Sequence, residues 1–212
     1  MDTTPEAPSA PLRTYGGVAG EDRQAGRRAQ LVEAGLNLLG AADGPQEFTV
    51  RGVCREAGLA ARYFYENFAD RDALAIAVHD HVVTDIATST LAAVRATPGD
   101  ARARTQAGLR NLVRKIAEDP RRGRLLFSPA LGHTVLAQRR VESTRWFVHL
   151  LGLQAREFYG LGESTRVELI AQMLVGGLAQ ALTSWLDGTL RVDEAGLVEL
   201  ATEIFVKVAD LV

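Results

Sequence analysis

Hydrophobic residues recur at helical spacing along almost the whole chain, and the strict alternation typical of strands is nearly absent. In the first such segment, residues 23–42, the apolar and small side chains share one stripe: Leu31, Gly35, Leu38, Leu39 and Ala42. Turn-forming residues separate the later segments. The pattern predicts an all-α protein with helices at about 23–42, 49–57, 60–67, 70–96, 101–118, 121–128, 134–159, 164–187 and 194–210.

The helices after the first are marked by capping residues. Thr49 is a plausible N-cap, and Gly58 is a terminator that can adopt positive φ. Asp70 and Asp72 complement the dipole at the start of the fourth helix. We therefore expect three parts: a disordered N-terminal tail over 1–20, a small three-helix domain over 21–70, and a larger helical domain over 71–212. The tail prediction rests on its three prolines and three glycines.

Residues 49–72, TVRGVCREAGLAARYFYENFADRD, place two short helices around a glycine turn, a spacing that fits a helix-turn-helix. In that motif the second helix enters the major groove of DNA with its first residues toward the base edges. Phe64 and Phe68 are four residues apart and can anchor this helix inward. Arg62 and Tyr63 stand near its beginning and can point outward.

The same segment resembles the DNA-binding domain of the tetracycline-repressor (TetR) family. The matching residues are Thr49-Val50, Val53-Cys54, Ala57-Gly58-Leu59, Tyr65, Phe68 and Arg71-Asp72-Ala73-Leu74. The resemblance implies three short N-terminal helices followed by a helical domain that binds an effector and dimerises. Two positions depart from the family pattern. Ala60 stands where Ser or Thr often caps the recognition helix, and Ala61 stands where a basic residue is common.

We expect DNA contacts from a local patch, because residues 21–72 hold seven arginines against nine acidic residues. Arg51 and Arg62 are candidates for base edges, and Tyr63 for a thymine methyl or a phosphate. The candidates for phosphate contacts are Thr49, Tyr65, Asn67 and Arg71, with Arg27 or Arg28 of the first helix nearby. Each of these arginines and tyrosines could instead be an ordinary surface or core-edge residue.

Residues 164–187 are apolar on nearly all sides, so this helix needs cover from its own domain and from a second partner. Gly176 and Gly177 weaken a helix unless another backbone approaches closely. Two such helices from each of two chains would form a four-helix interface, as the family resemblance also implies. The predicted interface residues are Met173, Gly176, Gly177, Gln180, Trp185, Ile204, Phe205 and Val208. A purely intrachain core is the alternative.

The resemblance further implies that the middle helices, residues 101–159, surround an effector pocket. Candidate lining residues are Phe127, Trp146, His149 and Leu153, of which the last three share a helix face. Aromatic stripes at this spacing more often belong to a core. The implied effector is small and largely apolar, and the sequence does not identify it.

Composition narrows the remaining possibilities. One cysteine, Cys54, excludes an intrachain disulfide and a cysteine-based zinc site, as expected in a reducing cytosol. The start of the chain has no signal-peptide pattern, and the apolar run over 169–182 is too short to span a bilayer. The sequence contains no enzyme motif, so we expect neither an enzyme nor a cofactor. His79 and His81 diverge on a helix, so we expect no metal site. We further expect a cytoplasmic protein with no membrane partner.

Together these features predict a ligand-responsive transcriptional regulator, most simply a repressor. It would bind a palindromic double-stranded DNA operator as a homodimer and be released by its effector. The alternative is a helical ligand- or protein-binding dimer that has lost DNA binding, which Ala60, Ala61 and the acidic balance favour. Repression and activation are not distinguished by the sequence.

Overall fold

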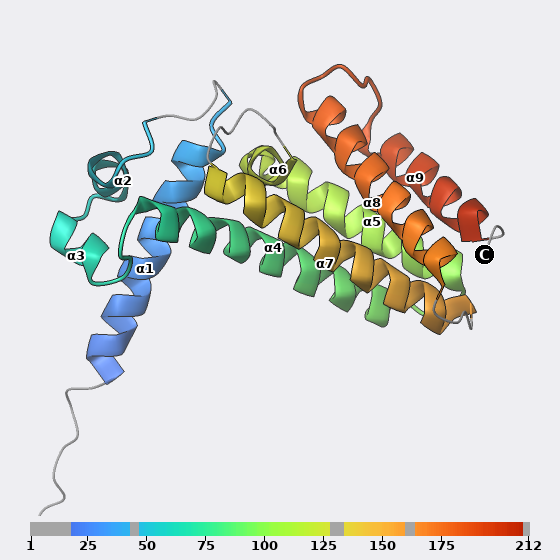
Figure 1. Ribbon diagram of the computed structural model, residues 1–212, viewed down its shortest axis with the longest axis horizontal. Coiled ribbons are helices and arrows are strands. Elements are labelled where there is room, and N and C mark those ends of the chain that lie inside the picture. Colours follow the sequence, from blue (N-terminus) through green and yellow to red (C-terminus); the bar gives the residue numbers. More distant parts are fainter. Residues whose placement is uncertain (1–17, 43–46, 128–133, 160–163, 210–212) are drawn as a thin grey trace, which may run out of the picture.

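The computed structural model describes residues 18–42, 47–127, 134–159 and 164–209 of the 212-residue chain. Within these ranges the chain forms nine helices and no strand (Figure 1). They are α1 (Val18–Leu39), α2 (Val50–Ala57), α3 (Ala61–Tyr65), α4 (Arg71–Ala96), α5 (Ala101–Glu118), α6 (Pro120–Phe127), α7 (Thr134–Tyr159), α8 (Thr165–Leu186) and α9 (Glu194–Ala209). The all-α prediction is confirmed.

The predicted boundaries agree with the observed ones to within two residues for every helix except the first. Helix α1 begins at Val18 rather than near residue 23, and it ends at Leu39. Residues 18–20 of the predicted tail are therefore helical, and residues 1–17 lie outside the described residues. Helix propensity alone predicts too late a start for α1, because Gly20 and Gly26 weaken the helical pattern there.

Local capping accounts for the turn between α2 and α3. The Thr49 hydroxyl accepts a hydrogen bond from the backbone N–H of Gly52 at 3.0 Å, as expected of an N-cap. Gly58 has φ 66°, the left-handed conformation that ends α2. The carboxylate of Asp70 caps α4 by accepting from Ala73 N at 2.7 Å. Ala60 provides no side-chain cap for α3, so the weak start expected there is present.

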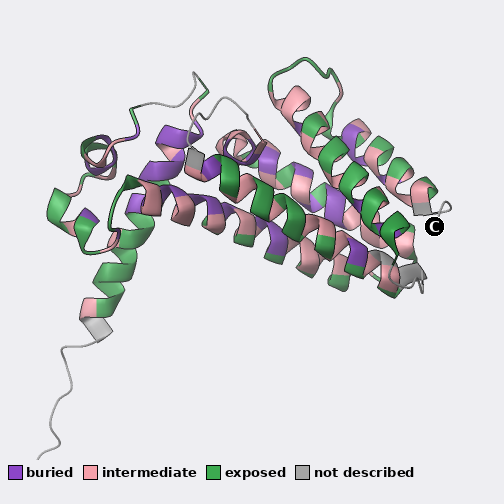
Figure 2. Cartoon of the chain, viewed as in Figure 1, coloured by how far each residue is buried: buried purple, intermediate pink, exposed green. Residues whose placement is uncertain are grey.

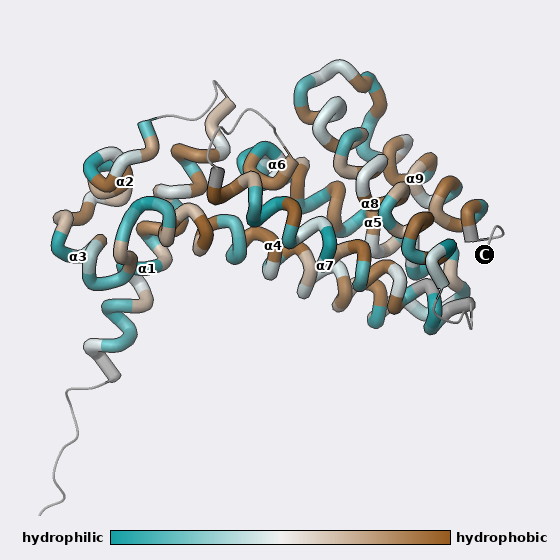
Figure 3. Tube along the Cα trace, in the orientation of Figure 1, coloured by the Kyte–Doolittle hydropathy of each residue, from teal (hydrophilic) through white to brown (hydrophobic). Residues whose placement is uncertain are grey.

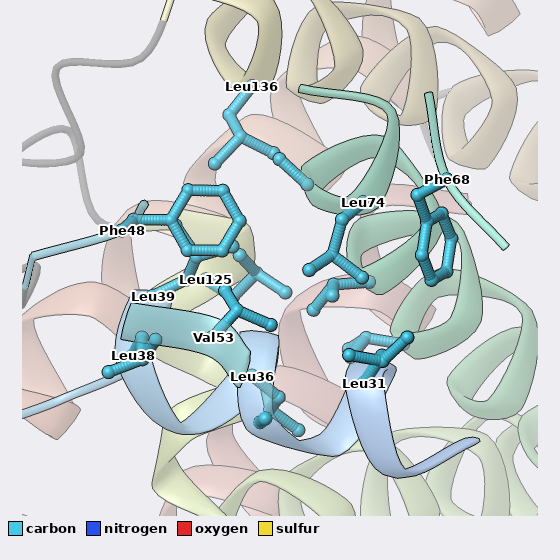
Figure 4. Close-up of a cluster of buried hydrophobic side chains, with 14 of the residues drawn as sticks. Leu31, Leu36, Leu38, Leu39, Phe48, Val53, Phe68, Leu74, Leu125 and Leu136 are labelled. Atoms are coloured by element: carbon cyan, nitrogen blue, oxygen red, sulfur yellow. The ribbon is translucent and has the colours of Figure 1, made fainter. Parts of the chain in front are cut away.

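One apolar cluster joins the first three helices to the rest of the protein (Figure 4). Its members on α1 are Leu31, Ala34, Leu36, Leu38 and Leu39; on α2 and α3 Val53, Cys54 and Phe64; and beyond them Phe48, Phe68, Leu74, Ala75, Val78, Val82, Ile86, Leu125, Leu126 and Leu136. Figure 4 shows side chains from α1, α2, α4, α6 and α7 converging on one centre. The helix-turn-helix therefore has no core separate from α4, α6 and α7.

The other half of the molecule is built on α4 and α5, which lie antiparallel. Asn111 of α5 donates to the hydroxyls of Ser89 and Thr90 of α4, each at 3.0 Å. Helix α7 lies alongside α4 in the same direction, and α8 and α9 complete this half at the end away from α2 and α3 (Figure 1). A second apolar cluster joins α5 to α8 and α9 through Leu109, Val113, Ile116, Leu182, Leu197 and Val198.

The N-cap of α2 provides a test of this local structure. We expect Thr49→Ala to destabilise the protein by about 1 kcal/mol, because an eight-residue helix loses the only side-chain acceptor at its start. Thr49→Ser keeps the hydroxyl and should stay within a few tenths of a kcal/mol of the parent. Urea denaturation followed by circular dichroism measures both changes, and equal loss in the two variants would show that the methyl group, not the cap, matters.

Candidate nucleic-acid interface and ligand cavity

Helix α3 projects from the end of the molecule farthest from α8 and α9 (Figure 1). Phe64 is completely buried and Phe68 is 5% exposed, so both anchor the segment inward as expected. Tyr65 is 62% exposed, and Ala61 and Arg62 are also exposed. The leading residues of α3 are therefore available to a partner outside the chain.

Tyr63 lies between two guanidinium groups. The Cζ atoms of Arg27, from α1, and Arg62 lie 4.6 and 4.5 Å from the centre of its ring. Arg62 also donates from Nη2 to the Tyr63 hydroxyl at 2.5 Å, and this hydrogen bond raises the pKa of the Arg62 guanidinium. This stack places two positive charges at the start of α3 and ties α1 to α3.

Several predicted DNA contacts have structural roles in this arrangement. The Asn67 amide is half-buried and donates to Tyr63 O at 2.8 Å, so it closes α3 instead of projecting from it. Arg28 covers the ring of Phe68 at 4.4 Å and donates to Asn67 O at 3.4 Å. Arg27 pairs with Glu66 at 3.6 Å. The sequence could not show these contacts, because each joins α1 to α3 or turns back on α3 itself.

The other candidates lie where an external contact can form. Arg51 is exposed on the first turn of α2, and Tyr65 is exposed on α3. Arg71 is exposed at the start of α4, although its Nε lies 3.5 Å from the Asp72 carboxylate. The Thr49 hydroxyl already accepts a bond from Gly52, which leaves its own proton for donation.

A chain of polar contacts connects the helix-turn-helix with α6. Glu56 of α2 accepts a hydrogen bond from Asn37 of α1 at 2.8 Å. Arg121 of α6 donates to the side chain of Asn37 and to the carboxylate of Glu33 on α1, the latter at 2.8 Å. Arg124 adds a hydrogen bond to Gly40 O at 3.3 Å. Helix α6 is therefore fastened to α1 by two of its arginines.

The same network continues into the helices on the other side of α6. Asp119 binds Arg121 through both carboxylate oxygens, at 2.8 and 2.7 Å. Asp85 of α4 accepts from Arg122 of α6 at 2.5 Å and from Lys115 of α5 at 3.0 Å. Burial alone would raise the pKa values of Asp85 and Asp119, but the hydrogen bonds and charges of these cations outweigh it and hold both pKa values below the usual range.

A cavity of about 280 Å³ lies between α4, α5, α7 and α8. Its walls are mostly aliphatic. The lining residues are Ile86, Ala87, Thr90, Leu91, Val94, Arg104, Thr105, Gly108, Leu109, Leu112, Leu126, Phe127, Ser143, Thr144, Phe147, Leu150, Leu151, Gln154, Val167, Ile170, Ala171, Leu174, Val175, Leu178, Ala179, Leu182, Phe205 and Val208. The cavity is thus bounded by α4, α8 and the end of α9 as well as by the middle helices that the sequence favoured.

Only one of the four predicted pocket residues lies in the wall of this cavity. Phe127 does, whereas Trp146, His149 and Leu153 lie on the exposed face of α7. Helix α7 carries apolar residues on two faces, and the stripe chosen from the sequence is the exposed one. Phe147, Leu150, Leu151 and Gln154 form the inward face instead, about 100° around the helix.

Helices α8 and α9 leave several apolar side chains exposed, which together form an uncovered apolar surface. Figure 2 colours much of both helices as exposed or intermediate, and Figure 3 shows hydrophobic residues along both. Met173 is 69% exposed and Ile204 55%, and Leu169 and Leu200 accompany them. Gly176 and Gly177 are exposed as well, and a Cβ at either would meet no atom within 4 Å. Gln180 is also exposed.

Three predicted interface residues face the other way. Trp185 donates from its indole N–H to Val192 O at 2.9 Å and packs on the α5–α9 cluster. Phe205 packs on the same cluster and reaches the cavity, and Val208 lines the cavity. The stripe chosen on α9 thus spans two of its faces, and Trp185 at the end of α8 packs within the chain.

Among the described helices, α8 alone is long and apolar enough to cross a membrane by length and composition. Its apolar run over residues 169–182 is shorter and does not reach that length by itself. Only 11% of its most apolar window is buried inside the single chain. A long apolar helix that is little buried within its own chain is equally expected where another protein surface covers it. No group of three or more His, Cys, Asp or Glu residues within the described part of the chain could hold a metal ion.

Comparison with known proteins gives a match in fold only. No protein-family model matches the chain, and no curated protein sequence matches it. Among solved structures, the fatty acid degradation regulator FadR of Bacillus halodurans matches with a TM-score of 0.71 and 16% identity, over 84% of this chain and 94% of that one.

Two other solved structures give the same result. FadR of Bacillus subtilis in complex with stearoyl-CoA has a TM-score of 0.68 and 16% identity, over 84% of this chain and 96% of that one. A TetR family transcription regulator of Marinobacter aquaeolei VT8 has a TM-score of 0.63 and 18% identity, over 87% and 96%. The chain has the fold of the TetR-family transcriptional regulators.

Proposed function

We propose that this protein is a ligand-responsive transcriptional regulator, acting as a repressor, that binds a palindromic DNA operator as a homodimer. The observation that carries the proposal is the exposed leading edge of α3, seated by Phe64 and Phe68 and carrying Arg62 beside Tyr63. An exposed recognition helix with an arginine at its start fits the major groove, where Arg pairs with guanine. The likeness in fold to solved regulators supports this reading.

In this proposal the residues around α3 divide into two groups. Arg62 and Arg51 reach base edges, and Tyr63 meets a thymine methyl or a phosphate. Thr49, Tyr65 and Arg71 donate to phosphates at the edges of the groove. Arg27, Arg28 and Asn67 hold α3 against α1, and Arg27 adds positive potential near the phosphates.

The homodimer is supported by the uncovered surface of α8 and α9. The surface combines four exposed large apolar residues with Gly176 and Gly177, where an added Cβ would lie more than 4 Å from any neighbouring atom among the described residues. A monomer rarely leaves such an apolar surface in water, and two-fold pairing of α8 and α9 would cover it with a four-helix interface. Two recognition helices would then read two half-sites roughly 34–36 Å apart.

The effector site of this proposal is the cavity between α4, α5, α7 and α8. Its walls are apolar with a few polar groups, as small-molecule sites usually are. Leu126 and Phe127 belong both to the cavity wall and to α6, whose Arg121 and Arg124 hold α1. Occupation of the cavity would shift α6 and with it the spacing of the two recognition helices, at a coupling free energy of about 1–3 kcal/mol. We place this regulator in the cytoplasm, with no enzymatic role.

A second candidate is a helical dimer that keeps the cavity but does not bind DNA. The pairing of Arg27 with Glu66, and of Arg62 with Tyr63, favours it, because these arginines already have partners within the chain. The bond to the Tyr63 hydroxyl occupies one of the five N–H donors of Arg62, so in the first candidate Arg62 would read a base with its other donors or after breaking that bond. The two candidates differ in one measurable property, affinity for DNA at low salt.

Selection of bound DNA from a random pool tests the proposed function. We expect an enriched palindrome whose half-site centres lie about 10 base pairs, or a multiple, apart. Recovery of no sequence at low salt by a protein that is folded and dimeric would favour the second candidate.

Replacement of Arg62 tests the recognition helix. We expect Arg62→Ala to weaken binding to the selected operator by about tenfold to a hundredfold and to relax base preference at one position of each half-site. Arg95→Ala is the matched control, because Arg95 is exposed at the far end of α4 and should leave binding unchanged. Fluorescence anisotropy with operator and mutated duplexes measures both, and an unchanged base preference in Arg62→Ala would remove Arg62 from the base-reading residues.

Charge substitutions on α8 and α9 test the dimer. We expect the double variant Met173→Glu, Ile204→Glu to sediment as a monomer at micromolar concentration, because two carboxylates per chain would be buried in the interface. Val141→Glu, on the exposed face of α7, changes an equally exposed apolar residue outside the predicted surface and should remain dimeric. A parent protein that sediments as a stable monomer at this concentration would contradict the interface.

A further inference from the structure

We infer that the cavity between α4, α5, α7 and α8 binds a long unbranched acyl chain with an anionic head, and that the head lies at Arg104. The tail then runs along α4 and α7 toward α6. Acyl binding stands on the cavity alone, whereas its effect on DNA rests on the proposed function.

The cavity is elongated along α4 and α7, because its lining residues follow each helix for more than two turns, from Ile86 to Val94 on α4 and from Ser143 to Gln154 on α7. The Asp80–Arg139 ion pair, at 2.5 Å, sets α7 beside α4 in the same direction. The inward residues of α7 then extend from Ser143 to Gln154, a separation of 11 residues. At about 1.5 Å per residue this wall is roughly 16 Å long, the length of an extended chain of about a dozen carbon atoms.

The two ends of this slot differ in chemistry. Arg104 is the only charged residue among the described residues of the wall. The contact of Asn111 with Thr90 fixes the register of α5 against α4 and places Arg104 near the C-terminal end of α4. The Asp80–Arg139 pair places Gln154 at the same level. Arg104 can therefore meet a carboxylate or another anionic head, joined by Gln154 if its amide leaves the Glu157 carboxylate, to which it donates at 3.3 Å.

The rest of the slot suits a hydrocarbon tail. Its middle is formed by aliphatic side chains such as Leu109, Leu150, Leu174 and Leu178. Aliphatic walls on all sides, with few hydrogen-bonding groups, favour a flexible chain over a ligand with several polar substituents. A straight chain fills a long slot without leaving the voids that a compact ligand would leave.

Helix α6 contributes to the other end of the slot. Leu126 and Phe127 lie there, on the helix whose Arg121 contacts Glu33 and Asn37 of α1. A short chain held at Arg104 does not reach these residues, whereas a long chain does. The ligand length that releases DNA should therefore exceed the length that gives measurable binding.

A chain-length series tests the occupant directly. Isothermal titration of the delipidated full-length protein with octanoate, laurate and palmitate should show affinity rising about fourfold per added methylene until the slot is full. Equal affinity for all three fatty acids, or no binding of any of them, would overturn the inference.

Two variants locate the head and the tail. Arg104→Gln should weaken binding of palmitate at least tenfold and leave the uncharged methyl palmitate unchanged. Arg102→Gln is the matched control on α5, because Arg102 pairs with Glu199 at 2.5 Å and does not line the cavity. An equal loss of palmitate binding in the two variants would remove the head from Arg104.

The second variant shortens the slot. Ala179 lies in the α8 wall toward α6, and Ala179→Phe should fill that end, weakening palmitate while sparing octanoate. Circular dichroism confirms that the variant is folded. If this folded variant binds palmitate as tightly as the parent, the tail does not run toward α6.

A third comparison identifies the source of the chain and separates the two proposals. Palmitate and palmitoyl-CoA are each titrated onto the protein bound to its selected operator. The form that releases DNA at the lower concentration is the natural form of the acyl chain. If neither binds but the protein still selects a palindrome, the acyl inference fails and the regulator stands. If both bind and no DNA is selected, the regulator fails and the acyl site stands.

Discussion

The apolar cluster that α1 shares with α3, α4, α6 and α7 is the constraint on which the structure depends. Leu31 and Leu39 of α1 are buried against residues of α4 and α6, and Phe64 of α3 is buried in the same cluster. Each such side chain contributes about 1.5–3 kcal/mol by leaving water, so separating α1 from α4 would cost several of these contributions at once. The helix-turn-helix therefore moves with α4 and α6 as one body. The direction of α3 is a property of the whole chain.

The polar network determines which helices are tied to α6. Arg121 and Arg122 are neighbours on α6, yet Arg121 binds Glu33 on α1 and Arg122 binds Asp85 on α4. Asp119 receives both arginines and lies in the less exposed part of this network. A displacement of α6 must break or carry along contacts on each side, and Leu126 and Phe127 put α6 within reach of a ligand. Packing makes the elements move together, and the ion pairs determine which elements follow α6.

Helix ends, which depend on contacts within a few residues, could be predicted from the sequence. The faces that helices bury, which depend on packing between helices, could not. Thr49, Gly58 and Asp70 set helix ends through contacts within three or four residues, so the boundaries followed from the sequence. The face of α7 that lines the cavity did not follow, because Trp146 and Phe147 are adjacent aromatics on different faces and only packing against α4 and α8 selects between them. On α9, Ile204 and Phe205 presented the same ambiguity. The stacking of Arg27 on Tyr63 joins residues 36 positions apart, which helical periodicity does not reveal.

The charge balance of residues 21–72 explains why these packing details would matter for the proposed recognition of DNA. A helix-turn-helix with an arginine excess could neutralise many phosphates regardless of how each side chain is held. Here Glu66 already pairs with Arg27, and Arg71 lies beside Asp72, so the positive potential near α3 comes from few groups. In the proposed regulator, few phosphate contacts would be made, so affinity for DNA would come from well-placed side chains and from doubling of the site by a second chain. Under the proposed function, the stack of Arg62 on Tyr63, the anchoring of Phe64 and the uncovered surface of α8 and α9 would serve one requirement. A short recognition helix on a weakly charged domain would be specific only if it were held in place and presented twice.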